Sequence, residues 1–127
     1  TYPELPRTLA EEVQGELLRN FYRTWFSQKN CQSIVYWNLC DGTAYGTESR
    51  FNAGLISSDF KEKNAYRVLD TLINHEWHTE TTVATDENGE AVWNGFYGEY
   101  DLDFCEKKET VALTPRSENE YLLSLSE

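Results

Sequence analysis

Apolar side chains recur at every fourth position near the start of the chain, a spacing that places them on one face of a helix. The members of this stripe are Leu9, Val13, Leu17, Phe21 and Trp25. Thr8 stands three residues before Glu11, which is the spacing of a capping box, and this predicts Thr8 as the helix N-cap. We therefore expect an amphipathic helix that begins near Thr8 and ends near Ser27.

A nearly continuous apolar run follows over residues 33–39, rich in β-branched and aromatic side chains. Such a run is typical of a strand that is buried on both faces in a parallel sheet. Residues 41–52 read as a loop, and apolar positions over 61–75 predict a second helix, capped by Ser58 or Asp59. This order of elements favours the α/β class, in whose barrels the loops after the strands carry the chemistry.

The pattern changes after Trp77, where short runs of Thr, Val and aromatic residues alternate with turns. We expect strands over residues 79–85, 91–105, 110–113 and 121–125, with a turn at residues 86–89. Strands separated by turns predict an antiparallel meander or a small sandwich. The chain is therefore predicted to have two domains, an α/β domain over 1–78 and a small antiparallel β domain over 79–127.

The net charge of the chain argues against two classes of binding partner. The 127 residues include 11 Lys+Arg and 22 Asp+Glu, which gives a formal net charge of −11. An acidic surface disfavours both the phosphate backbone of nucleic acids and anionic lipid, so we expect no nucleic-acid partner and no membrane partner. No apolar run approaches the ~18 residues of a membrane span. The chain contains no Met, so we expect Thr1 to lie inside a longer translated protein.

Cysteine and histidine predict no special chemistry. The three cysteines are too few and too widely spaced for a disulfide framework or a zinc site; they are Cys31, Cys40 and Cys105. His75 and His78 have no Ser, Cys or Asp partner at a recognisable motif spacing. We expect no metal and no cofactor.

Trp37, Asp41 and Tyr45 follow one another at intervals of four residues, at the end of the predicted strand and in the loop after it. Aromatic rings offer flat faces to the C–H groups of sugars, and a carboxylate accepts hydrogen bonds from hydroxyls. These three residues are the candidate substrate-binding residues. On spacing alone the plainer alternative is favoured, in which Trp37 belongs to the core and Asp41-Gly42 forms a turn.

Taken with its flanks, this segment resembles the last strand and following loop of glycoside hydrolase family ten, the endo-β-1,4-xylanases. Trp37, Asp41 and Tyr45 match the family register, with Tyr45 where the family usually has Trp. Further stretches resemble one branch of the family in order along the chain; they are residues 14–27, 54–56, 63–66, 76–79 and 95–100. The resemblance implies the C-terminal part of a (β/α)8 TIM barrel, its last helix–strand–helix, followed by a small antiparallel β appendage.

The resemblance further implies that the chain is part of a retaining endo-β-1,4-xylanase, secreted and acting on xylan. Retaining glycosidases use two carboxyl groups about 5–5.5 Å apart, and in this family both precede the matched region. Glu4 is a weak candidate for the nucleophile, and a solvated loop carboxylate is the plainer interpretation of it. We therefore expect the chain to be inactive by itself, with xylan or xylo-oligosaccharide and the remaining N-terminal part of the barrel as partners.

Two other interpretations stay open at the level of sequence. One is a non-catalytic carbohydrate-binding module that uses Trp93 and Tyr97 of the β region. The other is a scaffold or interaction segment without a ligand.

Overall fold

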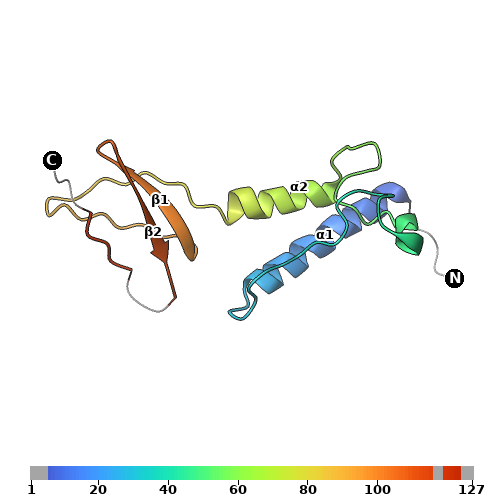
Figure 1. Cartoon of the computed structure of the whole chain (residues 1–127), viewed down its shortest axis with the longest axis horizontal. Coiled ribbons are helices and arrows are strands. Elements are labelled where there is room, and N and C mark those ends of the chain that lie inside the picture. The colour runs from blue at the N-terminus through green and yellow to red at the C-terminus, as the bar shows by residue number, and fades with distance from the viewer. Residues whose placement is uncertain (1–5, 116–118, 124–127) are drawn as a thin grey trace. The chain divides into compact units, whose positions relative to one another are not determined.

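The computed structural model describes residues 6–115 and 119–123. The chain divides into two compact units, Thr1–Glu76 and Trp77–Glu127, and each is described by itself. The first contains the helices α1 (Arg7–Phe26) and α2 (Asn64–Asp70), a short 3-10 helix η1 (Gly46–Arg50), and a π-helical turn η2 (Thr71–Glu76) that continues α2 (Figure 1). The second contains the strands β1 (Gly98–Phe104) and β2 (Lys107–Leu113).

Helix α1 confirms the helix predicted from the apolar stripe, but its start is capped differently. Its N-cap is Pro6, without a side-chain hydrogen bond, so the assignment of Thr8 as N-cap is wrong. The cause is the extended backbone of Pro6, at φ −50° and ψ 141°, whose carbonyl accepts the first helical bond from the Ala10 N–H at 3.0 Å. A proline has no N–H to satisfy, so it suits the boundary of a helix.

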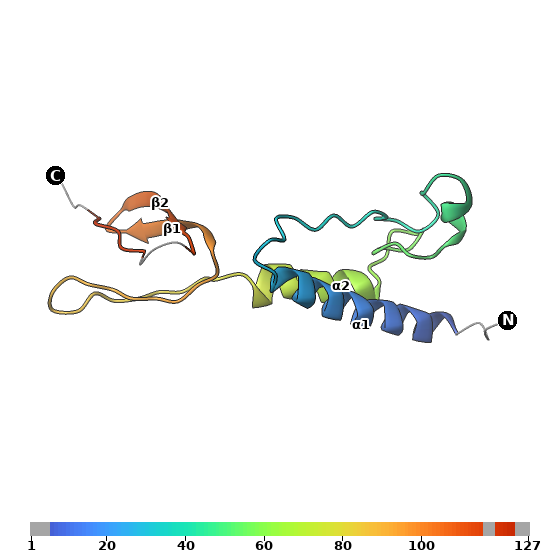
Figure 2. The ribbon, with the colours of Figure 1, turned by 90° about the horizontal axis from the view of Figure 1, so that it is seen from below.

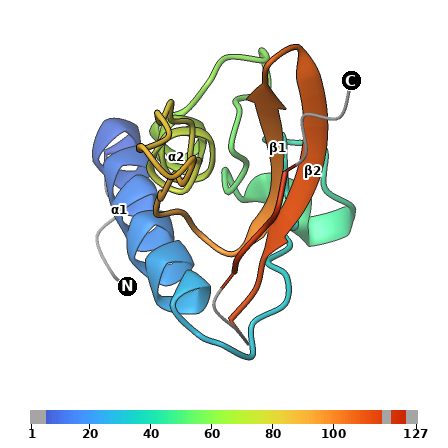
Figure 3. The same cartoon turned by 90° about the vertical axis from the view of Figure 1, so that its left-hand side faces the viewer.

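The core of the first unit lies between α1 and α2, which run side by side (Figures 1 and 3). Gly15 of α1 permits the close approach, because a Cβ atom there would lie 2.4 Å from Asn64 Nδ2. The best-buried apolar side chains are Tyr22, Ala65, Val68, Leu69 and Leu72. The N-cap of α2 is Lys63, so the expectation that Ser58 or Asp59 caps this helix is wrong.

Residues 33–39 do not form the expected buried strand. After α1 the chain turns and runs back along the helix pair without a ladder (Figure 2). Pairing begins only at Cys40, which forms an isolated parallel bridge with Ile56, and Ile56 in turn bridges Glu62. The segment lacks strand structure because no neighbouring strand within the described residues supplies its hydrogen bonds.

The second unit is built on one antiparallel hairpin, β1 with β2, in a register that runs from Gly98–Leu113 to Phe104–Lys107 (Figure 3). The predicted turn at residues 86–89 is confirmed by the Gly89 N–H, which donates to the Asp86 carbonyl at 3.1 Å. The strand expected over 91–105 shortens to β1. The strand over 79–85 is absent, as is the described part of the one over 121–125, and residues 124–125 of that prediction lie outside the described residues.

The predicted fold class is therefore wrong. Two helices and a two-stranded antiparallel sheet replace the expected last helix–strand–helix of a (β/α)8 TIM barrel with a β appendage. No parallel strand pair longer than the single Cys40–Ile56 bridge occurs in the part of the chain that the structure describes. A barrel strand requires a partner on each edge, and residues 34–38 pair with none of the residues that the structure describes.

Candidate functional site

A buried ion pair organises the loops between the two helices. Lys63 Nζ lies 3.2 Å from both carboxylate oxygens of Asp41, and it also donates to the Asn52 carbonyl at 2.8 Å. The Gly54 N–H donates to Asp41 Oδ1 at 2.8 Å. The side chains of Asp41 and Lys63 are 2% and 3% exposed. Their opposite charges are therefore paired with each other inside the protein and not with solvent. The carboxylate of Asp41 is occupied in holding the loop together.

Trp37 and Tyr45, the other two predicted site residues, point away from this pair into solvent. Their exposed fractions are 84% and 97%. The Trp37 indole Nε1 donates to Glu48 Oε2 at 3.2 Å, which ties it to η1. The structure therefore does not bring Trp37, Tyr45 and Asp41 into one pocket, and it also excludes Trp37 from the core. Their role in binding stays a prediction.

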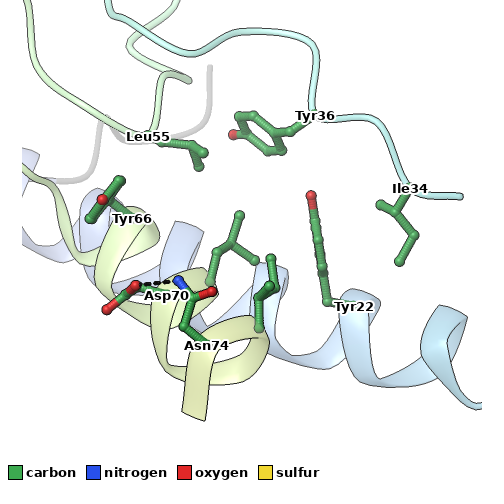
Figure 4. Close-up of a pocket in the computed structure, with 9 residues that line it drawn as sticks. Tyr22, Ile34, Tyr36, Leu55, Tyr66, Asp70 and Asn74 are labelled. Carbon is green, nitrogen blue, oxygen red and sulfur yellow. Dashed lines mark hydrogen bonds between the residues drawn. The ribbon is translucent and has the colours of Figure 1, made fainter. Parts of the chain in front are cut away.

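A cavity of about 320 Å³ opens beside the helix pair in the first unit. Figure 4 shows Tyr22 rising from α1 and Ile34 pointing down beside it, while Tyr36 extends from the segment above toward Leu55. Tyr36 is fixed in place, because its hydroxyl donates to the Ala53 carbonyl and accepts from Gln14 Nε2 at 3.1 Å. The lining is mostly apolar and aromatic, and the cavity is open to solvent on one side.

The rim of the cavity carries two polar groups on α2 and η2. Asn74 Nδ2 donates to Asp70 Oδ1 at 2.7 Å (Figure 4). Inside the cavity, burial raises the pKa of the Tyr22 hydroxyl, and the nearby Tyr36 raises the pKa further. A phenol with a raised pKa stays protonated at neutral pH and offers a hydrogen-bond donor, not a charge.

The other perturbed carboxyl groups have local structural causes. Hydrogen bonds from Lys61 and Ser57 lower the pKa of Asp59 to about 2, and Lys61 Nζ lies 2.7 Å from its carboxylate. Backbone N–H groups of Glu90 and Asn88 lower the pKa of Asp86 within its turn. Neither carboxyl is buried or paired with a second acid, so neither has the environment of a general acid or base.

Nothing in the described residues gathers three metal-ligating side chains. Cys31 and Cys105 are exposed free thiols, and Cys40 is a buried one whose Sγ donates to the Ser57 carbonyl at 3.3 Å. No helix in the described ranges has the length and apolar composition to cross a lipid bilayer.

The outer face of α1 is an unusual apolar surface. Each residue of its stripe (Leu9, Val13, Leu17, Phe21 and Trp25) is 41–50% exposed. Phe21 and Trp25 stack on one another with ring centroids 5.5 Å apart. Gly15, which faces α2, and Leu17 are two residues apart, and they therefore point roughly 160° apart around the helix. The α1 stripe is thus a second apolar face, distinct from the one that packs on α2.

A known protein of similar sequence gives a comparison that covers most of the chain. No family model matches the chain. The chain is similar to the anti-sigma-I factor RsgI6 of Acetivibrio thermocellus, with 28% identity over 119 residues. The similarity covers 94% of this chain, and the chain spans 14% of the length of that relative.

This comparison overturns the glycoside hydrolase interpretation. The matching relative is named an anti-sigma factor, a regulatory protein, and no glycoside hydrolase family model matches. The assignment as part of a retaining xylanase is wrong, as is the alternative of a carbohydrate-binding module. The predicted partners are also wrong; they are xylan or xylo-oligosaccharide and the remaining N-terminal part of the barrel. The motif matches misled because they are short and scattered, whereas the similarity to the anti-sigma factor extends over most of the chain.

Lys63 forms the buried ion pair with Asp41, and the sequence does not reveal it as a partner of that residue. It stands in a run with Lys61 and Glu62 that reads as a solvated charged segment. Lys61 is in fact exposed, at 80% of its side chain, while Lys63 is buried. No pattern in the sequence separates the two lysines, because the difference arises from the direction of the chain just before α2.

Proposed function

We propose that this chain is a protein-binding part of a longer regulatory protein similar to anti-sigma-I factors, in which it helps to control a sigma factor. The proposal is supported by similarity over 94% of the chain to a protein of that kind. Because the chain spans 14% of that relative, the inhibitory activity belongs to the longer protein as a whole. The part described here supplies a contact surface to it.

The observation that carries the proposal is the exposed α1 stripe. A helix in a self-contained domain turns one apolar face inward and leaves a polar face in water. Here α1 already packs on α2 through Gly15 and Tyr22, and it still presents five large apolar side chains to solvent. Contiguous exposed apolar surface of this kind marks contacts with other proteins.

Other functions have less support in the structure. The best carboxylate candidate, Asp41, is neutralised by Lys63. Trp37 and Tyr45 point outward, without convergent polar groups around them that would orient a small ligand. A secreted location for the chain stays a prediction from sequence.

The test uses the full-length protein that contains this chain, expressed with its sigma-I-type factor and a sigma-dependent reporter gene. The double variant Leu17→Gln/Phe21→Gln removes apolar surface from the middle of the α1 stripe without adding charge. We expect it to change reporter output by about tenfold, which corresponds to about 1.4 kcal/mol of contact free energy.

The matched control is Glu12→Gln/Glu16→Gln, which places the same side chains on an exposed face of α1 outside the stripe. The control should leave reporter output unchanged. If the stripe variant and the control behave alike, while both proteins accumulate to the wild-type level, the proposed function is wrong.

A further inference from the structure

Two asparagines of the second unit are followed directly by glycine, in the pairs Asn88–Gly89 and Asn94–Gly95. An asparagine can lose its side-chain amide without an enzyme when the main-chain nitrogen of the next residue attacks the side-chain carbonyl carbon. Glycine favours this attack, because it has no Cβ atom to obstruct the close approach. The structure places the two pairs in different surroundings, which should separate their reactivities.

The first pair is held in the turn at residues 86–89. The Gly89 N–H donates to the Asp86 carbonyl at 3.1 Å. The Asn88 N–H donates to Asp86 Oδ1 at 2.9 Å, and the Asn88 side-chain amide donates to Asp86 Oδ2 at 3.4 Å. The nitrogen that would attack and the amide that would leave are therefore both hydrogen-bonded to Asp86.

The second pair has none of these restraints. Asn94 and Gly95 are exposed, and they lie just before β1 in a stretch without helix or strand. No residue that the structure describes forms a hydrogen bond with the Gly95 N–H or with the Asn94 side chain. The two groups are therefore free to rotate toward each other.

We propose that Asn94 is a site of spontaneous deamidation, with water as the co-reactant. The Gly95 main-chain nitrogen bonds to Asn94 Cγ, and the Cγ–Nδ2 bond breaks. The side-chain nitrogen takes up the proton that the main-chain nitrogen gives up and leaves as ammonia. Water then opens the resulting cyclic imide at either of its carbonyls, which yields aspartate or isoaspartate without any oxidation or reduction. This inference does not depend on the proposed protein-binding role.

The surroundings of Gly95 determine what the modification does to the fold. A Cβ atom at Gly95 would lie 2.9 Å from Tyr100 Cζ, so the glycine main chain packs directly against the tyrosine ring. The Tyr100 hydroxyl donates to the Phe96 carbonyl at 2.8 Å and ties this stretch to β1. Isoaspartate adds a carbon atom to the main chain and displaces Gly95 from Tyr100, whereas aspartate adds only a negative charge.

Mass spectrometry tests the proposal on the full chain, incubated folded in neutral buffer, with each conversion localised by peptide fragmentation. Asn94 should convert about tenfold faster than Asn88, which corresponds to about 1.4 kcal/mol of activation free energy. In concentrated urea, which removes the turn, the two rates should converge. Equal rates in the folded protein, faster conversion at Asn88, or no conversion at Asn94 would overturn the proposal.

Two variants show whether the hydrogen bonds of the turn cause the difference. Asp86→Ala removes the carboxylate that holds Asn88, so it should raise the rate at Asn88 several-fold and leave the rate at Asn94 unchanged. Asn94→Gln should abolish the signal at this position, because a glutamine would have to close a larger ring. An unchanged rate at Asn88 in Asp86→Ala would show that the turn does not protect this residue.

Amide hydrogen exchange tests the consequence for the fold, with the amides of α1 as an internal reference. The isoaspartate form should exchange its β1 amides about fivefold faster than the unmodified protein, as expected for the loss of one hydrogen bond. The matched variant Asn94→Asp carries the same charge on a normal main chain and should exchange like the unmodified protein. If the isoaspartate form and Asn94→Asp exchange alike, the inferred displacement of Gly95 is wrong.

Discussion

Lys63 Nζ lies 3.2 Å from both carboxylate oxygens of Asp41, and the side chains of the two residues are 3% and 2% exposed. The pair joins the loop after residues 33–39 to the start of α2. The Asn52 carbonyl and the Gly54 N–H complete its hydrogen bonds. Removing either charge would leave the other one buried without compensation.

We expect Asp41→Ala to destabilise the first unit by about 3–5 kcal/mol, the usual cost of leaving half of a buried ion pair. Lys63→Met should have a similar effect. Chemical denaturation followed by helix circular dichroism measures the change. The control is Lys61→Met, which breaks the exposed pair with Asp59 and should leave the midpoint almost unchanged. Equal effects at Lys61 and Lys63 would contradict the structural role of the buried pair.

Gly15 provides a second test, at the contact between α1 and α2. Gly15→Ala places a methyl group 2.4 Å from Asn64 Nδ2, so the Asn64 side chain must rotate away and offsets part of the gain in helix propensity. In an Asn64→Ala background that side chain is gone. There the same substitution should stabilise the protein by about 0.5–1 kcal/mol, because alanine is the better helix former. If the midpoint of thermal unfolding changes equally in both backgrounds, the helices do not approach as described.

The turn of the β1–β2 hairpin offers a stabilising prediction. Cys105 and Glu106 have positive φ values of 46° and 66°, a conformation that favours Asn and Gly and costs other residues about 1 kcal/mol each. Cys105→Asn/Glu106→Gly should therefore stabilise the second unit by roughly 1–2 kcal/mol. Denaturation followed by Trp93 fluorescence reports the change. Cys105→Ser, which removes the thiol without favouring positive φ, should give no such gain.

Tyr22 predicts a loss of stability in alkali. Burial holds its pKa above the usual value of about 10, so the folded state favours the protonated phenol. The contribution of this group is complete below pH of about 10 and is lost as the pH rises through the raised pKa.

The thermal midpoint of the wild-type protein should therefore fall more steeply above this pH than that of Tyr22→Phe. Tyr97→Phe, at a residue that is 70% exposed, should retain the wild-type dependence. Identical alkaline profiles for the wild type and Tyr22→Phe would show that this hydroxyl is not buried in the fold.

The sequence predicts those features that depend on local pattern. The four-residue spacing of apolar side chains predicts α1, and the turn at Asp86 follows from its composition. The pattern also predicts part of β2, over 110–113. It misplaces the N-cap of α1, because the main-chain geometry of Pro6 prevails over the side-chain capping signal of Thr8.

Features that depend on distant partners were not predicted. An apolar, β-branched run has the composition of a buried strand whether or not a neighbour exists, so residues 33–39 were assigned to a sheet. The spacing from Trp37 marks Asp41 as a candidate residue, although the structural partner of Asp41 is Lys63, 22 residues further on. The sequence pattern gives no distance between such positions. The xylanase interpretation is wrong for a related reason. It rests on short local matches, and such matches do not determine the long-range strand pairing that a barrel requires.

The exposed segment at 33–39 also suggests a role for the negative charge of the chain, which is to oppose aggregation. An exposed apolar strand is a template for aggregation, and the formal charge of −11 keeps such templates apart in dilute buffer. Salt shortens the range of that repulsion to about 3 Å at 1 M. The solubility of the isolated chain therefore depends on ionic strength. Electrostatic repulsion between the acidic chains opposes aggregation through the exposed segment at 33–39.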